Sequence, residues 1–351
     1  MPWFTCIVSN VVFAVLLAIV AWFVQRCLQL PAVARLLWVA VLVKLVTPPL
    51  VSLPVVELPG SVACAFGLCN CPQHASAQGM VGEMLLGALL AAWLVGAAAT
   101  AWTAWRRWTR FERLIAQARP APRGWQSLAR RLSLELSIRR PPAILMVPGR
   151  LPPMVVPGRG RARLLLPTAL LGKLNASRRA SLLLHELVHI KRGDHLVRVL
   201  ELMVSIIFWW LPLVSLMGPQ LRACEETCCD ASVVARLPQA RRQYARLLLD
   251  VIDFASPSRR QVSPQATAMS AASNLEHRLR AILDTTQRRR HSWSVGAVTL
   301  GMALAILPCG FGYDFAKPKP PAISLDTCDP AAPASPVDHR DNKPFVGCCP
   351  S

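Results

Sequence analysis

Four long apolar runs constrain the fold of this 351-residue chain more than any other feature of its sequence. Each is close to the roughly 20 residues that a helix needs to cross the hydrocarbon core of a bilayer. The runs are Phe4–Gln25, Leu30–Leu53, Val81–Trp105 and Ser292–Phe311. With 53% hydrophobic residues and a mean hydropathy of +0.38, the composition is also too apolar for an ordinary soluble domain. We therefore expect a mainly α membrane protein with four transmembrane helices.

The positive charge is concentrated between the third and fourth runs. Of the 39 Lys and Arg residues, 32 lie between Trp105 and His291, together with 12 of the 19 Asp and Glu residues. The loop over residues 54–80 has no Lys or Arg, and neither do residues 1–10, so the first run is expected to be a retained span rather than a signal peptide. By the positive-inside rule, residues 105–291 are cytoplasmic in a bacterial inner membrane, and the N-terminus and C-terminal tail are extracytoplasmic.

The same charge distribution argues against a nucleic-acid surface. The formal net charge of +20 is compatible with nucleic-acid binding, but the arginines occur in scattered pairs without interleaved aromatic residues. The basic segment also lies between apolar runs, as a cytoplasmic domain between two membrane spans does. We expect the lipid bilayer, and no nucleic acid, to be in direct contact with the chain.

An H-E-x-x-H motif, His185, Glu186 and His189, lies within the apolar sequence SLLLHELVHIK. On a helix, two histidines four residues apart lie on one face, one turn apart, so both imidazoles can bind one Zn²⁺. Glu186 can then reach a water in the open coordination position, and it takes a proton that the ion makes more acidic. The motif indicates zinc-dependent hydrolysis with Glu186 as the catalytic base; the alternative is a helix with two surface histidines.

The third metal ligand is expected in the segment from Arg222 to Asp230. Glu226 and Asp230 are four residues apart and therefore share a helix face. Glu226 can supply the carboxylate that completes a His₂Glu site. Asp230 can accept the N–H of a ligating histidine and fix its tautomer.

Other candidate residues are weaker. Glu225 points about 100° away from Glu226. A thiolate from Cys228 or Cys229 would favour a closed, structural site and would leave the motif glutamate without a task. His195 lies about 80° off the face of His185, which makes it a possible transition-state donor rather than a ligand.

Residues 196–217 are long and apolar enough to cross the membrane, yet a full crossing would put Glu226 on the opposite side from His185. The aromatic cluster at Phe208–Trp210 and the helix breaker Pro212 interrupt this run. We therefore expect a re-entrant or surface-lying helical hairpin that returns to the same side.

Short apolar runs ahead of the motif predict a small β-sheet. They are Ala143–Val147, Met154–Val156 and Leu164–Leu166, and Pro-Gly sequences separate them, as in strands joined by hairpin turns. An edge strand beside the site would suit a peptidase, because it can pair with an extended substrate backbone.

Six of the 12 cysteines fall in the segments expected outside, where an oxidising compartment permits disulfides. A soft metal ion is the alternative for the Cys-Asn-Cys and Cys-Cys pairs. These cysteines are Cys64, Cys69, Cys71, Cys328, Cys348 and Cys349.

The expected organisation has four parts. They are three spans with a Cys-containing outer loop (1–104, loop 54–80), a cytoplasmic domain with a membrane-associated hairpin (105–291, hairpin 196–217), a fourth span (292–312), and a Pro- and Cys-containing extracytoplasmic tail (313–351).

In combination, these motifs resemble the BlaR/MecR family of signal-transducing membrane zinc metallopeptidases, which act as antirepressors. The resemblance covers residues 1–312 and is carried by the run His185–Asp194, the aromatic–Pro break, the E-x-x-x-D at Glu226–Asp230 and the segment Leu275–Leu283. It implies a gluzincin-like cytoplasmic peptidase domain with one Zn²⁺ per chain. It also implies cleavage of a cytoplasmic transcriptional repressor of the winged-helix type, and often of the chain itself, when a signal arrives from outside.

One departure concerns the signal. In the antibiotic sensors of that family a penicillin-binding domain with a serine nucleophile follows the last span, whereas residues 313–351 contain no S-x-x-K. β-Lactam sensing by acylation is therefore not expected, and the signal is expected to enter through the outer loop and tail or through a partner. The Ser-, Pro- and Ala-rich stretch 255–273 is a hypothetical self-cleavage site, with a plain connector as the alternative.

Two other functions remain open at this point. One is a housekeeping membrane zinc protease similar to the prenyl-protein or heat-shock membrane peptidases, which share H-E-x-x-H and E-x-x-x-D. The other is a non-catalytic metal-sensing membrane receptor that uses the outer cysteines. A homodimer is compatible with the sequence.

Overall fold

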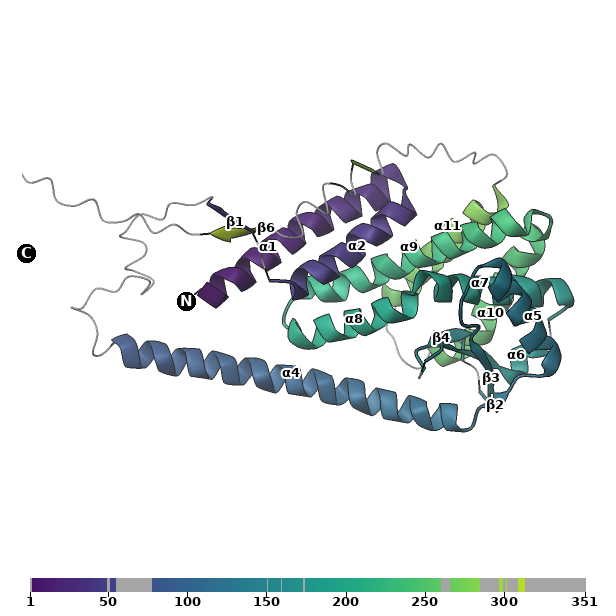
Figure 1. The fold of residues 1–351 in the computed structure, drawn as a ribbon, viewed down its shortest axis with the longest axis horizontal. Helices are drawn as coiled ribbons and strands as arrows, with labels where there is room; N and C mark the ends of the chain where they lie inside the picture. The colour runs from purple at the N-terminus through teal and green to yellow at the C-terminus, as the bar shows by residue number, and fades with distance from the viewer. Residues whose placement is uncertain are drawn as a thin grey trace, which may run out of the picture.

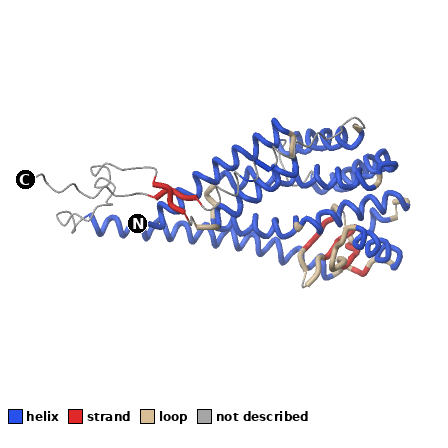
Figure 2. Tube along the Cα trace, turned by 45° about the horizontal axis from the view of Figure 1, so that its top comes forward, coloured by secondary structure: helices blue, strands red, loops and turns tan. Residues whose placement is uncertain are grey.

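The computed structural model describes residues 2–48, 51–54, 78–149, 151–158, 160–172, 174–259, 266–284, 297–298, 301 and 309–312. Helices dominate this part of the chain, and two small sheets lie at opposite ends of it (Figure 2). One sheet pairs β1 (Val51–Pro54) with β6 (Cys309–Gly312) near the start of the first helix. The other belongs to the domain that carries the H-E-x-x-H motif.

The first two helices form an antiparallel pair. Helix α1 (Pro2–Phe23) ends in a π-helical turn, η1 (Val24–Leu28), and α2 (Pro31–Val46) returns beside it (Figure 1). Small and branched side chains such as Ala14 and Leu37 are fully buried between them, in a cluster that also includes residues of α8 and α9. This helix pair is therefore packed onto the rest of the protein.

Helix α2 is shorter than the second predicted span, which extends to Leu53. It ends at Val46 because Pro48 disfavours helical geometry at Thr47, whose backbone is extended at φ −83° and ψ 129°. Residues 51–54 form strand β1 instead. At about 1.5 Å per residue, 16 residues reach only about 24 Å, less than the roughly 30 Å of a bilayer core.

Two helices among the described residues are long and apolar enough to cross a membrane, Cys6–Leu28 and Gly82–Ala116. Four spans are thus not established. Most of the fourth predicted span, 292–312, lies outside the described residues, and its last four residues form β6 rather than a helix. The glycines at 310 and 312 are poor helix formers, and the strand pairs in parallel with β1.

Helix α4 (Gln78–Ala116) is a continuous 39-residue helix that runs along one side of the molecule (Figure 1). The predicted boundary between a span and a cytoplasmic helix at residue 105 falls inside it, since no proline or glycine interrupts the sequence from 97 to 116. Its apolar window is unburied, apart from a contact at the tip of the α8–α9 hairpin. There Trp93 donates a hydrogen bond to the carbonyl of Ile207 at 2.9 Å, and Gly96 lies so close to the ring of Trp209 that a Cβ at this position would clash with it.

The motif-bearing domain combines a four-stranded sheet with helices. The sheet has the order β2-β3-β5-β4, with β2 at Arg119–Pro120, β3 at Ala143–Val147, β5 at Arg163–Pro167 and β4 at Met154–Val156. The three predicted strands, β3, β4 and β5, are present. Strands β4 and β5 are antiparallel neighbours, as β2 and β3 are, but β3 and β5 are parallel, so the predicted strands are not all joined as hairpins. Strand β4 lies at the sheet edge beside α7.

The remaining helices pack around α7, directly or through one another, and most of them contribute to the hydrophobic core of the motif-bearing domain. Their bounds are α5 Arg123–Glu135, α6 Thr168–Leu171, α7 Ala176–Arg192, α8 Asp194–Ile207, α9 Pro212–Arg236, a 3₁₀ turn η3 Pro238–Ala240, α10 Arg241–Arg259 and α11 Ala266–Leu283. Helices α8 and α9 form the hairpin expected over 196–217, and Pro212 occupies the first turn of α9, where its missing N–H costs nothing. Because α9 returns toward α7, Glu226 comes back to the motif.

Candidate metal centre

Helix α7 presents the motif from within a hydrophobic core. Its N-cap is Asn175, whose side chain accepts a hydrogen bond of 2.9 Å from the backbone N–H of Arg178. It ends at Gly193, which has a φ of 71° in the left-handed region that glycine adopts readily. Leucines on both sides of the motif are buried, so His185 and Glu186 are also withdrawn from solvent.

The three predicted metal ligands converge on one point. The Nε2 atoms of His185 and His189 are 3.2 Å apart. The carboxylate of Glu226 lies 3.5 Å from Nε2 of His185 and 3.6 Å from Nε2 of His189. Ligand bonds of about 2.0–2.1 Å in a tetrahedron would place the donor atoms about 3.3 Å apart. The donor set and its spacing therefore fit a Zn²⁺ ion.

His185 is oriented by a tyrosine and an aspartate. The hydroxyl of Tyr244, on α10, donates to Asp230 Oδ1 at 2.5 Å and lies 2.8 Å from Nδ1 of His185. The hydroxyl has one O–H, and it donates that O–H to the carboxylate. It therefore accepts a hydrogen bond from the Nδ1–H of the imidazole, and the Nε2 atom, which carries no proton in this tautomer, is the one at the metal position. The direct distance from Nδ1 to Asp230 is 3.5 Å. Asp230 thus supports the histidine through the tyrosine.

His189 is oriented by a different carboxylate. Its Nδ1 lies 2.8 Å from Oδ2 of Asp194, the first residue of α8. Burial alone would lower the pKa of His189, but the hydrogen bonds to Asp194 and Cys229 and the nearby charge of Glu226 together raise that pKa well above the ordinary value. For Asp194, burial opposes the hydrogen bond from His189 and the charge of Arg35, which together lower its pKa.

Arg278 of α11 joins two of the acidic residues. Its guanidinium lies 2.8 Å from Glu226 and donates to both oxygens of Asp230 at 2.7 and 2.9 Å. Burial of Glu226 would raise its pKa, but the hydrogen bond with His185 and the charge of Arg278 hold it well below the ordinary value. The carboxylate is therefore ionised and available to a cation.

Glu186 follows the first histidine on α7 and is 7% exposed. Burial raises its pKa, against the charges of the two histidines. A buried carboxylate with a raised pKa holds a proton more readily than an exposed one, which suits a group that takes and returns a proton.

The alternative ligands lie elsewhere or are less suited to the ion. Glu225 pairs with Arg198 at 2.6 Å and faces away from the histidines. Cys229 forms a second possible group with His189 and Asp194, but burial raises the pKa of its thiol to about 11, which favours the neutral form. Among the described residues no hydrogen bond or ion pair joins His195 to the other site residues, and its Nδ1 is buried without a partner.

Tyr244 and Arg278 were not predicted from the sequence as site residues. Tyr244 is one of only two tyrosines in the chain and lies in an arginine-rich helix, which is a weak signal. Arg278 lies within the segment Leu275–Leu283 that carried part of the family resemblance, yet nothing in its local sequence indicates that it reaches two acidic residues of another helix.

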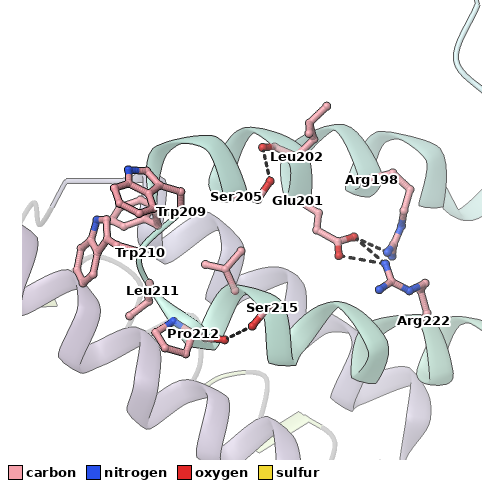
Figure 3. A pocket seen from close by; sticks show the side chains of 12 residues that line it. Arg198, Glu201, Leu202, Ser205, Trp209, Trp210, Leu211, Pro212, Ser215 and Arg222 are labelled. Carbon is pink, nitrogen blue, oxygen red and sulfur yellow. Dashed lines mark hydrogen bonds and ion pairs between the residues drawn. The ribbon is translucent and has the colours of Figure 1, made fainter. Parts of the chain in front are cut away.

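A separate cavity of about 630 Å³ opens between α8 and α9 (Figure 3). Glu201 lies between Arg198 and Arg222 at 2.5 and 3.1 Å, and Trp209 and Trp210 line the end near the hairpin turn. Arg198 also reaches Glu225, so four charged residues pair with one another and tie α8 to α9. The metal-centre residues do not line this cavity.

The comparisons agree with the site. No curated protein sequence matches the chain. A family model described as BlaR1 peptidase M56 matches residues 4–282, which include the motif, Glu226 and Arg278. Because that match covers more than half of the chain, the chain belongs to the BlaR1 peptidase M56 family of membrane metallopeptidases.

Proposed function

We propose that this protein is a membrane zinc metalloendopeptidase that cleaves a cytoplasmic repressor, and itself in some circumstances, in response to an extracytoplasmic signal. The observation that carries the enzymatic part is the convergence of His185, His189 and Glu226 within 4.8 Å, with Glu186 buried beside them. Membership of the M56 family supports the same chemistry.

In the proposed reaction His185, His189 and Glu226 would hold Zn²⁺, which would polarise the scissile carbonyl and make a nearby water more acidic. Glu186 is placed to accept a proton from the water that attacks the carbonyl and to return a proton to the leaving amine. Tyr244 holds the proton on Nδ1 of His185 and Asp194 holds it on Nδ1 of His189, which would leave both Nε2 atoms free to bind the metal. Arg278 holds Glu226 against the histidines.

Substrate backbone is proposed to pair with β4. This strand, Met154–Val156, is at the edge of its sheet and beside α7, so one side of its backbone is available to an extended peptide. A cytoplasmic repressor of the winged-helix type is the substrate proposed from the family, and a cytoplasmic position of the domain follows from the distribution of Lys and Arg. The candidate self-cleavage stretch 255–273 includes residues 260–265, which lie outside the described residues, and the outer cysteines also lie outside them.

The test compares wild type with Glu186→Ala in the cells that normally contain the protein. Cytoplasmic repressor fragments should appear on induction in wild type and fall by at least about a hundredfold with Glu186→Ala, because a general base contributes that much or more. The purified variant should still bind one Zn²⁺. The control is Glu276→Ala, an exposed acid of α11 whose side chain is 62% accessible. Equal fragment levels in wild type and Glu186→Ala would contradict the proposal.

The same experiment separates the two other functions. A housekeeping protease would cleave without an inducing signal and would show substrates other than a repressor. A non-catalytic metal receptor would keep its cellular response in the Glu186→Ala variant.

A further inference from the structure

A buried arginine on α2 reaches the motif-bearing domain. Arg35 donates from Nε and Nη2 to Oδ1 of Asp194, at 3.1 and 2.5 Å, and from Nη2 to the carbonyl of Arg192 at 3.1 Å. The side chains of Arg35 and Asp194 are only 10% and 6% exposed. Since α2 is the second apolar run of the sequence, these contacts join an apolar helix expected at the membrane to the first residue of α8 and the last residue of α7.

The same aspartate orients a metal ligand. Its second oxygen, Oδ2, accepts from Nδ1 of His189 at 2.8 Å. One carboxylate therefore bridges Arg35 and His189, with one oxygen for each. The other nearby cation, Arg192, is farther away, with its Nε 3.9 Å from Oδ1.

The bridge depends on Arg35 for a physical reason. A carboxylate withdrawn from water needs an opposite charge, because an unpaired buried charge is strongly disfavoured. Without Arg35 the aspartate would lose both hydrogen bonds at Oδ1 and would turn toward Arg192, its other nearby cation. That turn would weaken its hold on the Nδ1–H of His189.

We propose that Arg35 is a positioning residue of the metal centre, which acts through Asp194 to orient His189. Metal affinity would then depend on the position of α2 relative to α7. This inference rests on the proposed function, because it takes the histidines as metal ligands. Helix α2 leads to β1 and then to the loop 54–80 expected outside, so a displacement of α2 reaches His189 through one ion pair and one hydrogen bond.

A purely structural role would give a different result. If Arg35 only anchored α2, its loss would lower the stability of the protein but leave the metal dissociation constant unchanged. If it acts through Asp194, its effect on metal affinity should vanish once Asp194 can no longer form the bridge. A double-mutant cycle distinguishes the two.

The experiment measures the Zn²⁺ dissociation constant of the full-length protein in lipid nanodiscs, by competition with a chelator. The variants are Arg35→Gln, Asp194→Asn and the double variant, with Glu112→Gln as the control, since Glu112 pairs with Arg163 at 3.2 Å away from the metal centre. Each single change should weaken Zn²⁺ binding on the order of tenfold or more, the usual effect of removing an outer partner of a ligand. The double variant should bind no more weakly than Asp194→Asn, and the control should bind as wild type does.

The inference would be overturned if Arg35→Gln bound Zn²⁺ as tightly as wild type does. It would also be overturned if the loss of affinity in the double variant were the product of the two single losses. Either result would leave the proposed function intact. Absence of Zn²⁺ binding by wild type would instead overturn the proposed function. Arg35→Lys covers the case in which Arg35→Gln does not fold. Its single ammonium cannot reproduce both the Asp194 and Arg192 contacts, so it should bind Zn²⁺ severalfold more weakly than wild type, and unchanged binding would again contradict the inference.

Discussion

Each histidine of the metal centre has a hydrogen-bond partner at Nδ1, and the two partners are supported by different regions of the molecule. His185 is supported by the peptidase end of the chain, through Tyr244 of α10, Asp230 of α9 and Arg278 of α11. His189 is supported by Asp194 at the start of α8, and behind it by a residue of the apolar helix α2.

The difference lies in the group that touches each imidazole. A neutral hydroxyl contacts His185, whereas an ionised carboxylate contacts His189 directly and raises its pKa. The partners of His185 thus all belong to the motif-bearing domain, whereas the chain of partners behind His189 ends on α2. The following predictions test this division, from the largest expected effect to the smallest.

Removal of the cation on the His185 side should have the largest effect. Arg278→Leu leaves the buried Asp230, and the partly exposed Glu226, without their charge partner, so we expect a loss of about 3–5 kcal/mol in the free energy of unfolding, mainly from Asp230. Denaturant unfolding of the metal-free protein measures it. The matched control is Arg280→Leu, two residues along α11, whose side chain is 80% exposed and should contribute less than about 1 kcal/mol. Similar losses in the two variants would mean that Arg278 has no special role.

Tyr244→Phe should have a smaller effect on the same side. It leaves the Nδ1–H of His185 facing Asp230 at 3.5 Å, too far for a good hydrogen bond. We expect a destabilisation of about 1–3 kcal/mol and roughly tenfold weaker Zn²⁺ binding. Chelator competition and unfolding measure the two quantities. Unchanged zinc affinity would show that His185 needs no partner at Nδ1.

On the His189 side, a rise in pH should lower the stability of the metal-free protein and raise its zinc affinity. Because the pKa of His189 is raised in the folded, metal-free protein, its stabilising contribution is complete below the unfolded pKa near 6.5 and disappears as pH rises through the raised value. Zn²⁺ needs the deprotonated imidazole, so zinc affinity should increase over the same range. Thermal unfolding of the metal-free protein and zinc competition, each from pH 6 to 9, test the two signs. Asp194→Asn should flatten both dependences.

The smallest effect is expected at Cys229. Its thiol is buried, and its pKa of about 11 favours the protonated form. Cys229→Ala removes a weak thiol partner of His189 but should change zinc affinity by less than about threefold, since Asp194 still holds Nδ1 of that histidine. A loss as large as that caused by Glu226→Gln would instead support the thiolate ligand that the sequence left as an alternative.

The parts of this fold that could be predicted are those encoded by local spacing. The helix of the motif, the return of the chain that brings Glu226 to it, and the three strands ahead of it follow from helical periodicity, a proline after aromatic residues, and short apolar runs between turns. Each signal lies within about twenty residues of the feature that it predicts.

The remaining features depend on contacts between distant segments. Arg35 meets Asp194 across 159 positions of the chain, and Tyr244 meets His185 across 59. No local pattern identifies such partners, because an arginine at the start of an apolar run is equally compatible with a contact to lipid headgroups. The parallel pairing of β3 with β5 and that of β1 with β6 are missed for the same reason.

The length of helix α4 has a mechanical consequence. It is joined to the hairpin tip near Gly96, and roughly 30 Å farther along, at about 1.5 Å per residue, Ile115 packs with Val147 of β3, Val156 of β4 and Leu165 of β5. If α4 pivots at Gly96 without bending, a tilt of about 10° displaces Ile115 by about 5 Å. Any change in the angle of α4 would therefore reach the sheet, and its edge strand β4, as a displacement of several ångströms.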